Sequence, residues 1–128
     1  MACLETTFLI DILKGKEDII RFRDELEKSE KRLTVAAPSV TEIWFGALFS
    51  KKTEKDKAMI RELVSSMEVL PLDLSSAEEA AEIDAELTRQ GIRIETEDIM
   101  IAAIAKTNGE KLVTRDQHFA RIPGLRVL

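Results

Sequence analysis

The chain has 128 residues, of which 45% are hydrophobic, enough for one globular domain with a buried core. It has no apolar run of about 18 residues, as a membrane span requires, and no signal-like N-terminus, so we expect a cytoplasmic protein. One cysteine and one histidine exclude an internal disulfide and a zinc site built from such ligands. The net charge of −5 argues against a protein that coats DNA.

Apolar segments of strand character alternate with helical segments along the chain. The expected strands are residues 2–4, 33–36, 67–70, 111–114 and 125–128. The expected helices are residues 7–13, 17–31, 38–49, 53–66, 77–90 and 97–107. We expect Ser75 or Ser76 to cap the fifth helix and Thr96 to cap the sixth. The alternation predicts a single α/β domain over residues 1–128, with a mainly parallel sheet under helices.

Four acidic residues occupy positions where a carboxylate is costly to bury. Glu42 is the only charged residue between positions 35 and 49, and Asp98 opens an apolar helix. Glu5 and Asp116 each follow the end of an expected strand, where open α/β sheets bind their ligands. A buried carboxylate is unfavourable unless it is paired or binds a metal. The four acids therefore predict a shared cation site, and their hard oxygen ligands suit Mg²⁺ or Mn²⁺.

Each acid taken alone also has an ordinary explanation. Asp98 would stabilise the first turn of its helix, and Glu42 would pair with a distant arginine. Asp116 would be a turn residue, and Glu5 would face water at a strand end. Asp11 lies six positions after Glu5, and we expect it to face outward and to take no part in the site.

Four segments, in this order, resemble the motifs of the PIN-domain family, and within it the VapC-type toxins of prokaryotic toxin–antitoxin pairs. They are residues 4–10 (LETTFLI), 39–46 (SVTEIWFG), 98–103 (DIMIAA) and 112–119 (LVTRDQHF). The resemblance implies a three-layer α/β/α domain whose five-stranded, mainly parallel sheet has the order 3-2-1-4-5. It also implies Mg²⁺- or Mn²⁺-dependent cleavage of single-stranded RNA.

The resemblance also assigns roles to individual residues. Glu5, Glu42, Asp98 and Asp116 would be the catalytic and metal-binding acids. Thr6 and Thr114 would orient those acids by hydrogen bonds, and Arg115 would contact a substrate phosphate. A homodimer and a small antitoxin partner are implied as well, with the helices near residues 22–26 and 44–49 offering the groove for the antitoxin.

Glu5 departs from the family pattern, which normally has an aspartate at this position. The extra methylene moves the carboxylate outward by about 1.5 Å, a displacement that can be costly in a reacting site. Two alternatives to the toxin therefore stay open. One is a binding module with this fold that holds RNA or a partner without cutting it. The other is a housekeeping nuclease for RNA processing with the same chemistry.

Overall fold

The centre of the molecule is a parallel sheet of four strands in the order β3-β2-β1-β4. The computed structural model describes residues 1–30 and 32–128. The strands are β1 (Ala2–Leu4), β2 (Leu33–Ala36), β3 (Glu68–Leu70) and β4 (Lys111–Val113). The helices are α1 (Thr6–Leu13), α2 (Glu17–Ser29), α3 (Ala37–Leu48), α4 (Thr53–Ser65), α5 (Leu74–Arg89) and α6 (Thr96–Thr107).

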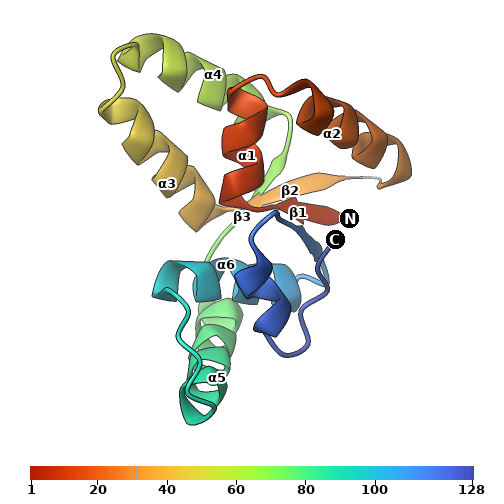
Figure 1. Ribbon diagram of the computed structural model, residues 1–128, viewed down its shortest axis with the longest axis vertical. Coiled ribbons are helices and arrows are strands. Elements are labelled where there is room, and N and C mark those ends of the chain that lie inside the picture. The colour runs from red at the N-terminus through yellow and green to blue at the C-terminus, as the bar shows by residue number, and fades with distance from the viewer. Residues whose placement is uncertain (31) are drawn as a thin grey trace.

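The helices form a layer on each side of this sheet. Figure 1 shows α1 to α4 on one face and α5 and α6 on the other. Because side chains alternate along a strand, Ala2 and Leu4 pack into the core under α1 to α4, while Cys3 packs against α5 and α6. Every side chain from Ile101 to Ala105 is buried, so α6 lies in the interior. The expected three-layer α/β/α fold is confirmed.

The expected fifth strand, residues 125–128, is reduced to a single parallel bridge between Leu112 and Val127. Val127 lies beside β4, where the order 3-2-1-4-5 places a fifth strand, but the described sheet has four strands. Gly124 has a φ of 76°, which turns the chain immediately before this segment. The bridge consists of two hydrogen bonds at one residue of β4, since the Leu112 N–H donates to the Arg126 carbonyl and the Leu128 N–H donates to the Leu112 carbonyl.

Two expected helix caps are also wrong. Asp73 caps α5, accepting a hydrogen bond from the Ser76 backbone while the Ser76 hydroxyl bonds to the Asp73 backbone. This reciprocal arrangement satisfies two backbone donors, so the helix begins earlier than expected. Thr96 is the first residue of α6 and not its cap, which is Glu95. The expected helix over residues 17–31 ends at Ser29, and Lys31 lies outside the described residues.

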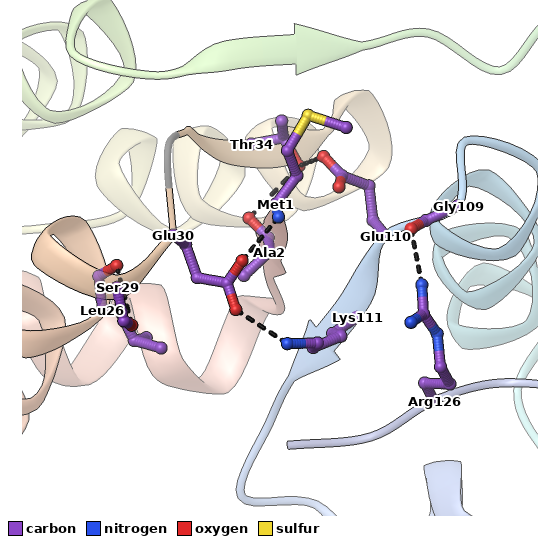
Figure 2. Close-up of polar contacts among 10 residues, drawn as sticks. All are labelled: Met1, Ala2, Leu26, Ser29, Glu30, Thr34, Gly109, Glu110, Lys111 and Arg126. Carbon is purple, nitrogen blue, oxygen red and sulfur yellow. Dashed lines mark hydrogen bonds and ion pairs between the residues drawn. The ribbon is translucent and has the colours of Figure 1, made fainter.

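Polar contacts gather at the amino-terminal end of the strands, as Figure 2 shows. Glu30 accepts hydrogen bonds from Lys111 Nζ and from the Met1 ammonium group, and these two contacts lower its pKa to about 2. The Thr34 hydroxyl lies 2.9 Å from Glu110 Oε1 beneath α6. The acids singled out from the sequence lie elsewhere: Glu5 and Asp116 follow the carboxyl ends of strands, Asp98 lies in the first turn of α6, and Glu42 in the second turn of α3. Within the described part of the chain, no helix is long and apolar enough to cross a membrane.

Candidate active site

Glu5 lies between the carboxyl end of β1 and the first residue of α1, and only 2% of it is exposed. Its side chain caps the helix, with Oε2 accepting from the Thr7 backbone at 3.1 Å. Oε1 accepts from the Thr7 hydroxyl at 2.6 Å and from the Thr114 hydroxyl at 2.5 Å. The burial of this carboxyl is therefore offset by three donors. The alternative explanation, in which Glu5 faces water at a strand end, is thereby excluded.

Glu42 is oriented by a short chain of hydroxyl groups. The Thr6 hydroxyl lies 2.9 Å from Glu42 Oε1 and 2.9 Å from Ser39 Oγ. Because it carries one hydrogen, it can donate to the carboxylate while accepting from Ser39. Ser39 and Glu42 are three residues apart on α3 and so lie on one face of that helix. Thr6 thus forms a hydrogen bond with the acid Glu42, and its role in orienting a metal-binding carboxylate stays a prediction.

Asp98 lies in the first turn of α6, and its pKa is raised to about 6. Burial is the largest cause, followed by the negative charges of Glu5 and Asp116, then those of Glu97 and Glu95. Asp98 therefore interacts electrostatically with two of the other predicted acids, Glu5 after β1 and Asp116 after β4. The alternative explanation, in which Asp98 only stabilises the start of its helix, does not account for a raised pKa. A helix N-terminus favours the charged form of the carboxyl and would lower its pKa.

The pKa of Glu42 is also raised, again chiefly by burial. The Thr6 hydrogen bond acts in the opposite direction, while Glu97, Asp98 and Glu5 add repulsion. No arginine or lysine forms an ion pair with Glu42 among the described residues. The alternative of a distant arginine partner is thereby excluded, and Glu42 belongs to the same negative cluster.

Asp116 follows β4 and caps the short 3₁₀ helix Gln117–Arg121. Its backbone N–H donates to Thr114 Oγ1 at 2.9 Å, and that same hydroxyl donates to Glu5. Asp116 Oδ1 accepts from the His118 backbone and lies 2.9 Å from His118 Nδ1. Thr114 therefore contacts both the Glu5 carboxyl and the backbone that carries Asp116, and its role in orienting metal-binding acids stays a prediction.

Arg115 lies between Thr114 and Asp116 in the chain, but its side chain points toward α1. Its Nη1 donates to Asp11 Oδ2 at 3.2 Å, and Lys16 Nζ lies 2.9 Å from Asp11 Oδ1. The Lys16 hydrogen bond is the largest cause of the lowered pKa of Asp11. The prediction that Asp11 faces outward is wrong, since only 9% of it is exposed.

The donor set of the cluster fits a divalent cation. Buried carboxylates whose mutual repulsion and burial raise their pKa values are stabilised when a cation lies between them. Oxygen ligands of this kind suit Mg²⁺ or Mn²⁺. Within residues 1–30 and 32–128, no three acidic, histidine or cysteine side chains already form a closed set around one ion position. The acids would have to rotate inward or share the ion with water.

Two contributors to this site escaped the sequence analysis. Ser39 is fully buried behind Thr6, and Thr7 donates two hydrogen bonds to Glu5. The i, i+3 spacing of Ser39 and Glu42 on one helix was the available signal for Ser39. For Thr7, the signal was its place two residues after an acid at a helix start, where capping side chains find their donors.

Comparison with known proteins agrees with the fold. The PIN domain matches residues 2–125, and the chain belongs to the PIN-domain family. Its expected resemblance to VapC-type members is confirmed as well. A tRNA(fMet)-specific endonuclease VapC of Salmonella typhimurium is 34% identical over 97% of this chain and 93% of its own. A protein of the same description from Shigella flexneri is 33% identical over 96% and 92%.

A solved structure supports the same relationship. The DNA-bound VapBC structure from Salmonella typhimurium contains a chain 30% identical to this one. The two superpose with a TM-score of 0.92, covering 100% of this chain and 98% of the other.

Proposed function

We propose that the protein is a metal-dependent endoribonuclease that cleaves single-stranded RNA and is the toxin of a toxin–antitoxin pair. The observation that carries the proposal is the cluster of wholly or partly buried acids brought together from separate elements, in which burial and the charges of Glu5 and Asp116 raise the pKa of Asp98. The relatives named VapC are described as ribonucleases or as tRNA(fMet)-specific endonucleases. A cytoplasmic location remains a prediction from the sequence.

The residues of the cluster would divide the work as follows. Glu5, Glu42, Asp98 and Asp116 would hold Mg²⁺ or Mn²⁺, some of them through water. When bound, such an ion lowers the pKa of a water nucleophile and neutralises charge at the scissile phosphate. Thr6 and Thr114 keep the Glu42 and Glu5 carboxyls in fixed orientations through the hydrogen bonds already described.

Cleavage of a defined RNA tests the proposal directly. Initiator tRNA is the first substrate to try, because relatives of comparable length are described as specific for tRNA(fMet). We expect cleavage that requires Mg²⁺ or Mn²⁺, stops on chelation, and is lost in Asp98→Asn and in Asp116→Asn. An unrelated structured RNA and a generic single-stranded oligonucleotide serve as substrate controls. Cleavage that persists in both variants would place the active site elsewhere.

A second candidate, a binding module that does not cut RNA, is favoured by one observation. The Glu5 carboxyl already accepts three hydrogen bonds within the protein, which competes with metal binding. Glu5→Asp separates the two candidates, because aspartate remains a good helix cap. A large gain of cleavage would mean that Glu5 impairs the native enzyme, and unchanged cleavage would mean that Glu5 is an adequate ligand.

An antitoxin partner is suggested by a solved relative and by a cavity of this protein. The solved relative from Salmonella typhimurium is a VapBC structure, so we propose a small antitoxin as partner. A cavity of ≈ 380 Å³ between α1, α3 and α4 offers it a largely apolar groove. Its lining includes Ile10, Ile43 and Ile60, together with Glu42 of the acidic cluster. An antitoxin seated there would lie against the active site.

A homodimer is the second proposed assembly. Phe45, Leu48 and Phe49 form an exposed apolar surface at the end of α3, where Phe49 is 77% exposed. The rings of Phe45 and Phe49 lie 5.0 Å apart and so present one continuous aromatic surface. Exposed apolar surface of this kind is typical of interfaces with another chain.

A further inference from the structure

Asp11 is a buried acid that the proposed chemistry does not use. It lies on α1, with Lys16 Nζ at 2.9 Å on one oxygen and Arg115 Nη1 at 3.2 Å on the other. One carboxylate thus holds two cations, which come from the loop after α1 and from the loop after β4. The side chain of Arg115 remains 54% exposed and that of Lys16 48% exposed, so both cations reach solvent.

The position of Arg115 is fixed relative to the acidic cluster. Its two neighbours in the chain are bound to that cluster, since Thr114 donates to Glu5 and the Asp116 backbone donates to Thr114. Asp11 lies six residues after Glu5, about 9 Å along the axis of α1 at the rise of an α-helix. The two cations therefore lie beside the acidic cluster and not inside it.

We infer that Asp11 is a positioning residue that holds Arg115 and Lys16 as a pair of cations beside the acidic site, where they bind an RNA phosphate other than the one that is cleaved. This inference rests on the proposed function, because it assigns part of the RNA path to the same site.

The physical argument concerns charge and rigidity. The three side chains carry a net charge of +1, and they border a cluster of acids that repels a polyanion. A guanidinium anchored through one nitrogen keeps its other donors in a fixed fork, so less side-chain entropy is lost when it binds a phosphate. A free Arg115 on a flexible stem would lose that advantage.

A positioning role for Asp11 and an effect of net charge alone predict opposite changes in RNA affinity when Asp11 is neutralised. Removing the negative charge of Asp11 should strengthen RNA binding if only net charge matters. If Asp11 positions the cations, Asp11→Asn should weaken binding. Asp18→Asn is the matched control, because it makes the same charge change at an exposed position in the first turn of α2 that forms no ion pair within the described residues.

The experiment measures the affinity for a short, fluorescently labelled single-stranded RNA by anisotropy, at several salt concentrations and with Mg²⁺ present. All chains carry Asp98→Asn so that the RNA stays intact. We expect Asp11→Asn to weaken binding about fivefold and to reduce the salt dependence by about 0.7 in log–log slope, as loss of one phosphate contact does. Arg115→Gln, at a half-exposed position that leaves the core intact, should give a similar loss, and the double variant should add little to it.

Three outcomes are informative. Weaker binding in Asp11→Asn, no loss in Asp18→Asn and a double variant no worse than either single variant support the inference. Unchanged or tighter binding in Asp11→Asn, or fully additive losses, overturn the positioning role and leave the proposed nuclease intact. Absence of RNA binding both in these chains and in the native chain overturns the proposed function and the inference together.

Discussion

The Thr114 hydroxyl donates to Glu5 Oε1 at 2.5 Å, which joins the end of β4 to the start of α1. The same hydroxyl accepts from the Asp116 backbone at 2.9 Å. A single threonine thereby sets the positions of two acids that are 111 residues apart in the chain. The central pairing of β1 with β4 makes this contact possible, since it brings the carboxyl ends of both strands together.

Thr114→Val tests the strength of this link. Valine keeps the shape but leaves the buried Glu5 carboxyl without one donor, so we expect the free energy of unfolding to fall by about 1–2 kcal/mol. Urea denaturation at neutral pH measures it. Thr41→Val, at an exposed position of α3 with no side-chain hydrogen bond among the described residues, is the control and should change little. Equal effects of the two substitutions would mean that the contact contributes nothing.

Asp98→Asn should make the metal-free protein more stable at neutral pH. The pKa of Asp98 in the folded protein is about 6, above its ordinary value of 3.8, so ionisation of this group opposes folding. Stability is therefore lost as the pH rises between these two values, and the asparagine variant escapes that loss.

The expected gain of Asp98→Asn is about 1–2 kcal/mol at pH 7, after allowance for solvent screening. It should vanish well below pH 3.8, where the Asp98 carboxyl is neutral in both the folded and the unfolded state. Urea denaturation with a chelator present, at both pH values, measures it. A variant that is less stable than the native protein at pH 7 would contradict the assigned environment of Asp98.

Glu30 should show the opposite pH dependence at the far end of the sheet. Hydrogen bonds from Lys111 and the Met1 ammonium group lower its pKa from 4.5 to about 2. Its contribution to stability is therefore present above pH 4.5 and lost as the pH falls toward 2. Glu30→Gln should lower the melting temperature at neutral pH and flatten the acid limb of the stability curve. Glu25→Gln, an exposed change on α2, the helix that ends just before Glu30, should leave both unchanged.

The apolar surface of α3 makes a prediction about assembly. If it forms the homodimer interface, Phe45→Glu should shift the protein from dimer to monomer, because a buried unpaired carboxylate strongly disfavours association. Sedimentation or light scattering over a range of protein concentrations measures the shift. Lys55→Glu, a charge change on an exposed part of α4, controls for a general effect of added negative charge. A dimer that survives Phe45→Glu would place the interface elsewhere.

Much of the fold could be predicted from the sequence, while the four acids stay a prediction that the structure places in one region. Strands and helices alternate clearly, and Glu5 and Asp116, which each follow a short apolar strand, are thereby placed at one edge of a parallel sheet. Glu42 was conspicuous because no other charge lies near it in the chain. These signals are local in the sequence. The rule that ligands bind at the carboxyl ends of parallel strands predicts that the acids lie close together in space.

The remainder depends on contacts between distant segments. The orientation of Asp11 could not be predicted because its partner Arg115 is 104 residues away. The spacing of Asp11 from Glu5 along the chain does not show that the loop after β4 places Arg115 beside Asp11. The fifth strand was predicted from apolar character alone, whereas its pairing depends on β4, with which only Val127 of that segment forms a bridge.

The most direct test of the central claim is calorimetric titration of Mn²⁺ into the native protein and into Asp98→Asn. We predict that the native protein binds Mn²⁺ above pH 6, more weakly as the pH falls and Asp98 takes up a proton, and that the variant does not bind it. Equal binding by both proteins, or binding by neither, would contradict a metal site built on these four acids.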